Sequence, residues 1–190
     1  MSARRSALPF ALALAACGGE NGPFGPASIA DAGSNDDAVA ANDPLDLPPR
    51  CTSGKIRDPN ESEGPEMMPG RPCSTCHAEE NAASGEGDAP IFAFAGTVFP
   101  SGHEPDDCIA ESSEGAEIVV TDAAGNVFIE TANRSGNFSS EAHELVLPIS
   151  AKVVFRGRER AMRVPQPSGE CNLCHAATGR NGAPGRITLP

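Results

Sequence analysis

Apolar residues are concentrated between residues 89 and 165, where their spacing is typical of β-strands. Residues 91–99 form a nearly continuous apolar run, and shorter apolar segments follow at 116–121 and 127–131. The five residues that separate the last two segments, Asp122-Ala-Ala-Gly-Asn126, are a hairpin turn signal. We therefore expect a β-hairpin inside a larger β domain.

A longer alternating pattern follows in the same region. Its apolar positions are Leu145, Leu147, Ile149, Ala151, Val153 and Phe155. The other face carries Glu144, Ser150, Lys152 and Arg156, with some apolar exceptions. Side chains alternate between the two faces of a strand. The pattern therefore predicts one long strand with an apolar face, as in a β-sandwich.

The amino-terminal residues 1–16 show a different pattern, that of an export signal. Arg4 and Arg5 precede an apolar run that is too short to span a bilayer. The run ends in Leu-Ala-Ala-Cys17-Gly, which resembles the lipobox of bacterial lipoproteins and implies lipidation of Cys17. An ordinary secretory signal with an incidental Cys17 is the alternative. Both interpretations place the protein outside the cytoplasm.

Residues 17–50 are rich in Gly, Ala, Asp, Asn and Pro and contain few large apolar side chains. Such a segment buries too little apolar surface to offset the entropy of ordering. We expect a disordered tether with a reach of about 30 Å.

Composition restricts the fold and the class of partner. The chain contains 20 Gly, 18 Pro, no Trp and no Tyr, which predicts little helix and a modest core. We expect a mainly β protein, a small β-sandwich at 89–165 flanked by irregular segments at 51–88 and 166–190. The net charge of −12 argues against a nucleic-acid partner.

The chemistry of the chain lies in its seven cysteines. Four occur in two complete motifs, Cys73-Ser-Thr-Cys76-His77 and Cys171-Asn-Leu-Cys174-His175. Two intervening residues let both thiols of a motif reach the vinyl groups of one porphyrin, and the next residue, His, then faces the iron. The motifs predict two covalently attached haems c, with His77 and His175 as axial ligands. Cys51 and Cys108 remain as a candidate disulfide.

Two other interpretations of these cysteines stay open. A structural zinc could bind the two cysteine pairs, but zinc-binding pairs usually lie about 15 to 20 residues apart. Cys76 and Cys171 are much further apart, and a four-cysteine zinc site does not need a His after each pair. Dithiol redox chemistry is the other interpretation, although no βαβ pattern surrounds either motif.

A sixth iron ligand is expected from His103, His143, Met68 or Met162. We favour His103, because a loop residue can be aimed at iron without disturbing a packed strand. Pro105 restricts the backbone near His103, and a Cys51–Cys108 bridge would anchor the same loop. An open sixth position is the alternative, and it would imply small-ligand sensing or peroxidase-like activity.

The segment between the motifs resembles the carboxypeptidase-regulatory-like, transthyretin-like β-sandwich. The resemblance rests on Gly96-Thr-Val-Phe99, residues 115–120 and residues 131–138, and it covers about seventy residues. It implies a fold and no function.

With both motifs included, the chain resembles small exported dihaem c-type cytochrome lipoproteins of Gram-negative bacteria. The residues that carry this resemblance are Met68-Pro-Gly70, His103-Glu-Pro-Asp-Asp-Cys108, Arg160-Ala-Met162 and Asn181-Gly-Ala-Pro-Gly-Arg186. The resemblance implies a lipid-anchored, non-enzymatic electron carrier of the periplasm or outer membrane that meets redox partner proteins. The alternative is a cell-surface binding module in which the cysteine pairs hold zinc.

Overall fold

The computed structural model describes residues 47–58, 60, 64–85, 87–141 and 144–190. The predicted export signal, the lipidation residue Cys17, most of the predicted tether and His143 lie outside these residues. Within them, no helix is both long and apolar enough to cross a membrane.

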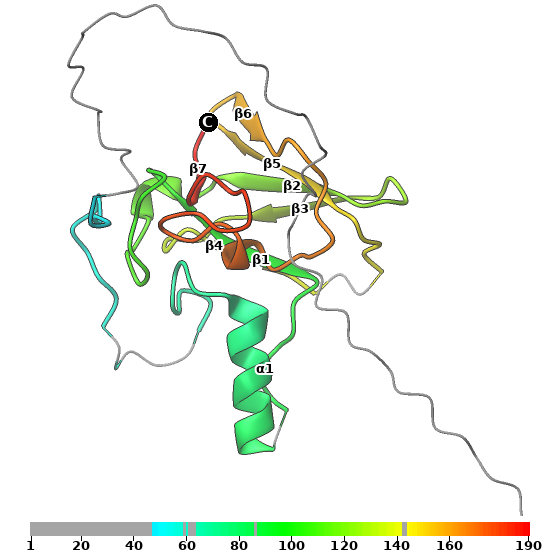
Figure 1. Ribbon diagram of the computed structural model, residues 1–190, viewed down its shortest axis with the longest axis horizontal. Helices are drawn as coiled ribbons and strands as arrows, with labels where there is room; N and C mark the ends of the chain where they lie inside the picture. Colours follow the sequence, from blue (N-terminus) through cyan, green and yellow to red (C-terminus); the bar gives the residue numbers. More distant parts are fainter. Residues whose placement is uncertain (1–46, 59, 61–63, 86, 142–143) are drawn as a thin grey trace, which may run out of the picture.

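The described chain is mainly β and forms two sheets (Figure 1). In the three-stranded sheet, the central strand pairs antiparallel with one neighbour and parallel with the other; the order is β4 (Asn137–Ser140), β1 (Phe94–Phe99), β7 (Ile187–Thr188). The four-stranded sheet is antiparallel throughout, in the order β3 (Val127–Thr131), β2 (Glu117–Thr121), β5 (Ser150–Phe155), β6 (Arg158–Ala161).

One hydrophobic core joins the two sheets. Phe94 and Val98 of β1 contribute from the three-stranded sheet, whereas Ile118 of β2 and Val153 of β5 contribute from the four-stranded sheet. Every residue of β1 is buried. Burial on both faces explains why β1 appears in the sequence as an apolar run without alternation.

The predicted hairpin is confirmed. β3 has the predicted bounds, β2 begins at Glu117, and the two strands pair in register from Glu117 with Thr131 to Thr121 with Val127. In the turn, Oδ1 of Asp122 accepts hydrogen bonds from the N–H groups of Ala124 and Asn126 at 2.9 and 2.8 Å.

The long strand predicted from residue 145 to residue 155 is wrong in its first half. β5 begins only at Ser150, and the side chain of Leu147 is 46% exposed. Pro148 has no amide hydrogen to donate to a neighbouring strand, so the ladder does not extend through it. From Ile149 to Phe155 the apolar positions do face the core.

The segment around the first motif was expected to be irregular, and this expectation is also wrong. Cys73–Ser84 form the α-helix α1, which ends at Gly85 with φ +73° and a hydrogen bond to Asn81 O. The helix contains several Ala and Glu, which are good helix formers, but it lacks the apolar periodicity on which the sequence analysis relied. α1 extends from the side of the sheets opposite to β6 (Figure 1).

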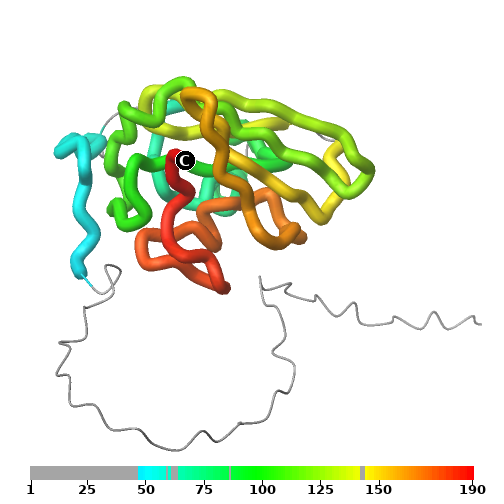
Figure 2. Tube along the Cα trace, turned by 90° about the horizontal axis from the view of Figure 1, so that it is seen from above, coloured from blue at the N-terminus to red at the C-terminus, as the bar shows by residue number. Residues whose placement is uncertain are grey.

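Two short 3-10 helices complete the elements, η2 (Glu111–Ser113) and η3 (Cys171–Leu173). The second carries the start of the second motif and packs against β1. Figure 2 shows the carboxy-terminal segment, orange to red, folded against one side of the sheets.

Candidate functional site

The first motif occupies the first turn of α1. Cys73 is the first helical residue, and the N–H of Cys76 donates to Pro72 O at 3.1 Å. Residues three and four positions apart are neighbours on a helix surface. Cys73, Cys76 and His77 therefore share one face, with both cysteines half-buried and His77 buried.

A single hydrogen bond orients the ring of His77. Its Nδ1 lies 2.6 Å from the carbonyl oxygen of Pro90, and a carbonyl only accepts, so Nδ1 carries the proton. In the neutral form of the ring, Nε2 then keeps its lone pair. The ring also contacts that of Phe92, with centroids 5.4 Å apart.

The second motif repeats this arrangement on a shorter helical turn. The N–H of His175 donates to Cys171 O at 3.0 Å, which closes the turn. Nδ1 of His175 lies 2.9 Å from Gly185 O. Burial lowers the pKa of His175 and the hydrogen bond to Gly185 offsets only part of that effect, so the ring is held neutral near pH 7.

Both motif histidines thus present Nε2 as an available lone pair. Among the residues that the structure describes, none forms a hydrogen bond with Nε2 of His77 or His175. A histidine that binds a metal through one nitrogen usually donates its other N–H to a carbonyl or carboxylate, which fixes the tautomer and the ring orientation. Both rings fit that pattern.

Side chains of the second motif hold the first motif in place. Glu170, next to Cys171, accepts a hydrogen bond from the N–H of Ser74 at 2.6 Å through Oε2. Burial raises the pKa of Glu170, although hydrogen bonds from the N–H groups at the start of α1 act against that rise. The carboxyl group therefore caps a helix about a hundred residues away in sequence.

Asn172, between the two cysteines of its motif, makes a second connection. Its Nδ2 donates to Arg71 O at 2.8 Å, and its Oδ1 accepts from the N–H of Thr97 in β1 at 3.1 Å. The side chain is buried. The side-chain amide of Asn172 therefore connects the second motif with the segment before α1 and with the central strand β1.

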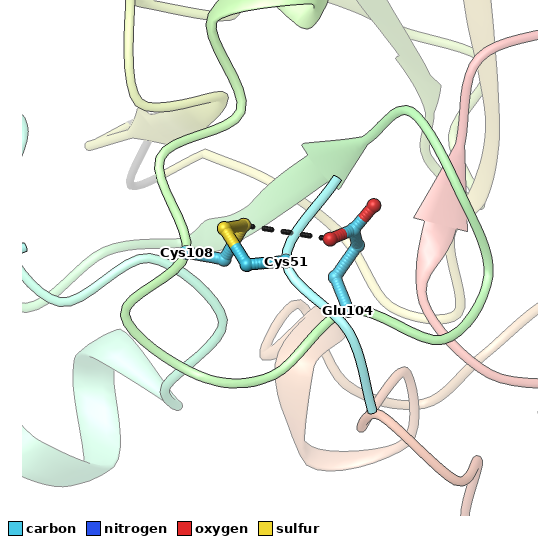
Figure 3. Close-up of side chains that lie close together, drawn as sticks. All are labelled: Cys51, Glu104 and Cys108. Carbon is cyan, nitrogen blue, oxygen red and sulfur yellow. Dashed lines mark hydrogen bonds between the residues drawn. A yellow bond between two sulfur atoms is a disulfide. The ribbon is translucent and has the colours of Figure 1, made fainter. Parts of the chain in front are cut away.

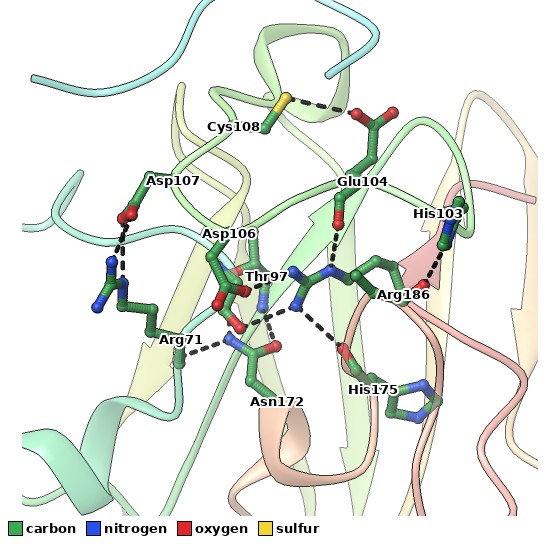
Figure 4. Close-up of polar contacts among 12 residues, drawn as sticks. Arg71, Thr97, His103, Glu104, Asp106, Asp107, Cys108, Asn172, His175 and Arg186 are labelled. Atoms are coloured by element: carbon green, nitrogen blue, oxygen red, sulfur yellow. Dashed lines mark hydrogen bonds and ion pairs between the residues drawn. The ribbon is translucent and has the colours of Figure 1, made fainter. Parts of the chain in front are cut away.

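Arg186 links the same segments from the other side (Figure 4). Its buried guanidinium donates to Gly70 O and Glu104 O at 2.9 Å and to His175 O at 3.4 Å. It also pairs with Asp106 at 2.5 Å. Gly70 lies near the first motif and His175 belongs to the second, so one cation holds both backbones.

A close backbone approach allows the second motif to reach β1. A Cβ on Gly169 would lie 1.9 Å from Ala93 O, and Gly169 O accepts from the N–H of Ala95 at 2.9 Å. Only glycine fits at this crossing, which seats Cys171 beside β1.

Burial controls the protonation of two motif thiols. It raises the pKa of Cys73 and that of Cys171 to about 12, with a smaller contribution in the same direction from the carboxylate of Glu170. Dithiol redox sites instead rely on a lowered thiol pKa. These two thiols stay protonated near pH 7, which argues against the dithiol interpretation.

Three of the motif cysteines, Cys73, Cys76 and Cys171, are free thiols.

Cys51 and Cys108 form a disulfide, the pair that the cysteine count leaves over (Figure 3). Their sulfur atoms lie beside the buried carboxylate of Glu104, which also accepts a hydrogen bond from the N–H of Thr52 at 2.8 Å. Among the described residues, these three form the one cluster whose possible metal ligands lie within 4.8 Å of one another. The bonded sulfurs are not thiolates, and the four motif cysteines form no such cluster there.

The three described candidates for the distal ligand, His103, Met68 and Met162, lie in different segments of the chain. Both ring nitrogens of His103 face carbonyl oxygens, Nδ1 that of Ala177 at 2.6 Å and Nε2 that of Leu47. Met68 is half-buried in the loop before α1 at φ +43°. Met162 follows β6 and donates its N–H to Ala151 O. A metal could bind His103 only by displacing one of these carbonyl contacts, and the predicted ligand role stays a prediction.

Sequence reasoning missed Glu170, Asn172 and Arg186. Two of these residues lie in or beside the second motif, yet nothing in their spacing indicates that they contact the first motif. A buried arginine that binds backbone carbonyls likewise leaves no sequence pattern.

No family model matches this chain, and no curated protein and no solved structure is significantly similar to it.

Proposed function

We propose that this protein is a c-type dihaem cytochrome that transfers electrons at the bacterial cell envelope. The observation that carries the proposal is the shared geometry of the two motif histidines. Each ring donates Nδ1–H to a backbone carbonyl and directs a free Nε2 lone pair away from that bond. That is how a histidine is prepared to bind iron.

The residues of each motif fit a covalently attached haem. Cys73 and Cys76 would hold one haem through thioether bonds and Cys171 and Cys174 the other, with His77 and His175 as iron ligands. A haem so attached supplies a one-electron Fe(III)/Fe(II) couple. The chain's own part is to fix the sulfur atoms on helical turns and to orient both imidazoles through Nδ1.

The contacts between the motifs support a two-centre relay rather than two independent sites. Glu170 and Asn172 join the second motif directly to residues 71–74. Two haems attached at these turns would be close neighbours, so an electron could pass between them within one chain.

Attachment at either motif needs both of its cysteines as thiols, because each thiol adds to one vinyl group of the haem. The zinc alternative receives no such support, because the motif sulfurs are not clustered among the described residues.

The proposed setting is an exported, lipid-anchored protein of the periplasm or outer membrane that exchanges electrons with redox proteins. It follows from the predicted signal at 1–16 and lipidation of Cys17. The proposed role is electron transfer; an open sixth position at either iron would add the alternative of peroxidase-like activity.

The haem content of three chains tests the proposal. Pyridine haemochrome absorbance and the mass of the denatured mature protein should give two covalent haems per chain. Replacing Cys171 and Cys174 with Ala should leave one haem, since each motif binds its own. Replacing Cys51 and Cys108 with Ala is the matched control and should leave two. A colourless chain that contains zinc, or a haem count that the Cys171→Ala/Cys174→Ala change leaves unaltered, would overturn the assignment.

A further inference from the structure

The cationic side chains of this acidic protein are unevenly distributed. The chain has a net charge of −12, yet residues 152–163 contain five cations, Lys152, Arg156, Arg158, Arg160 and Arg163, and one acid, Glu159. These residues form β6, most of β5 and the turn between them, which we call the basic hairpin. Its charge is opposite to that of the chain as a whole.

The four arginines of the basic hairpin are exposed and are not used in ion pairs. Lys152 pairs with Glu159 at 2.7 Å, which neutralises the one acid. The guanidinium of Arg156 lies over the ring of Phe155 at 4.9 Å. Among the described residues, no acid pairs with Arg158, Arg160 or Arg163. Their charge is therefore available to a partner.

The position of the hairpin makes its surface accessible. β6 is an edge strand, bonded only to β5, and it lies on the side of the molecule opposite to α1 (Figure 1). Val164, which follows Arg163, is 62% exposed. Exposed arginines are attracted to anionic lipid headgroups, and an exposed apolar side chain beside them can enter the interface.

We propose that the basic hairpin is a docking surface for anionic lipid, with the guanidinium groups bound to phosphate-bearing headgroups. A lipid surface is favoured because the cations lie along an extended edge, which meets a flat layer of charge at several points. Docking in this way would direct α1 and the first motif away from the lipid. The inference does not depend on haem attachment.

Vesicle binding tests the proposal with the full chain. Partition is measured by sedimentation on phosphatidylcholine vesicles and on vesicles of equal phosphatidylcholine and phosphatidylglycerol. The readout is the ratio of the two, because an acyl anchor contributes equally to both. The ratio should exceed unity at low salt and fall at high salt, about 0.03 and 0.5 M, as screening requires.

Paired charge variants locate the effect. Arg158→Gln/Arg160→Gln should lower the ratio about 10- to 30-fold, since each arginine near an anionic surface is worth about a fivefold change. Arg50→Gln/Arg180→Gln removes the same charge from exposed positions outside the hairpin and should change the ratio less than about twofold.

Three outcomes would overturn the proposal. The first is an anionic-to-neutral ratio near one at low salt for the unmodified chain. The second is an equal loss in both double variants, which would reflect net charge alone. The third is the absence of vesicle preference together with a different role for the arginines. Self-association of Arg158→Gln/Arg160→Gln would assign them to protection of the sheet edge. Binding of an acidic protein by the unmodified chain would assign them to a protein partner.

Discussion

The three described histidines differ in how many ring nitrogens meet carbonyl oxygens. His77 and His175 each use Nδ1 alone, whereas His103 uses both nitrogens. A metal could bind His103 only by displacing one of these carbonyl contacts, whereas Nε2 of His77 and of His175 has no hydrogen-bond partner among the described residues. At the scale of single residues, this difference separates the proposed iron ligands from a histidine that joins loop segments.

The buried thiols lead to a prediction about alkaline stability. In a haem-free chain kept anaerobic, Cys73 and Cys171 retain their protons up to about pH 12, whereas in the unfolded chain they lose them near their ordinary pKa of 9.0. The folded state binds more protons in that interval, so the free energy of unfolding should fall as pH rises from about 9 to 12.

Haem attachment should remove this pH dependence, because a thioether has no proton to lose. Denaturant unfolding at pH 8 and pH 10 measures the change in the free energy of unfolding for the haem-carrying and the haem-free protein. Other groups that titrate in this range are present in both proteins, so their contribution cancels in the comparison. A haem-free Cys73→Ala/Cys171→Ala variant is the control and should lose less stability over the same range. Equal losses in all three proteins would contradict the prediction.

At the scale of elements, the start of α1 depends on a residue from another segment. Its N-cap residue is Pro72, which makes no side-chain capping bond, and its first turn contains no acid. Glu170 supplies the missing acceptor and a negative charge at the positive end of the helix. The helix that carries the first motif is therefore stabilised by the second motif.

Removal of this cap should destabilise the chain. We expect Glu170→Ala to lower the free energy of unfolding by about 1 kcal/mol, the usual effect of losing a capping side chain. Glu170→Gln keeps an oxygen acceptor and should lose less. Denaturant unfolding measures both.

The matched control for this change is Glu79→Ala, an exposed position of α1. It should change stability by less than about 0.5 kcal/mol. If Glu170→Ala behaves like Glu79→Ala, the carboxyl group does not stabilise the helix.

At the scale of the whole molecule, a disulfide attaches the start of the described chain to the β domain. Cys51 and Cys108 are separated by 57 residues, with Cα atoms 5.5 Å apart. Cys108 and Phe99 are buried together in a small second core against which Cys51 packs. The covalent link and this core hold the segment before α1 against the end of β1.

Removing this disulfide should increase the conformational entropy of the unfolded chain, because the loop is no longer closed, and should therefore destabilise the folded protein. For a loop of this length we expect Cys51→Ala/Cys108→Ala to lose about 4 kcal/mol of stability, or less where the native geometry relaxes. Thermal unfolding measures the loss. A variant as stable as the unmodified chain would show that the described loops are held by non-covalent contacts alone.

The strand predictions hold where the local pattern is sufficient. The hairpin from Glu117 to Thr131 follows from two apolar segments around an Asx turn, and each of those signals is local in the chain. The prediction fails at Leu147, where an alternating pattern continues into a segment that forms no strand. It also fails at α1, because that helix is held by Glu170 rather than by an apolar face of its own.

The sequence alone determined the two cysteine and histidine motifs, the cysteines left over and the mainly β character, because each depends on residues that are neighbours in the chain. The tertiary structure decided which backbone carbonyls hold His77 and His175, that Glu170 caps α1, and that Arg186 joins the two motifs. These contacts join segments that are far apart in sequence. Their partners are chosen by packing around the core, which no local spacing encodes.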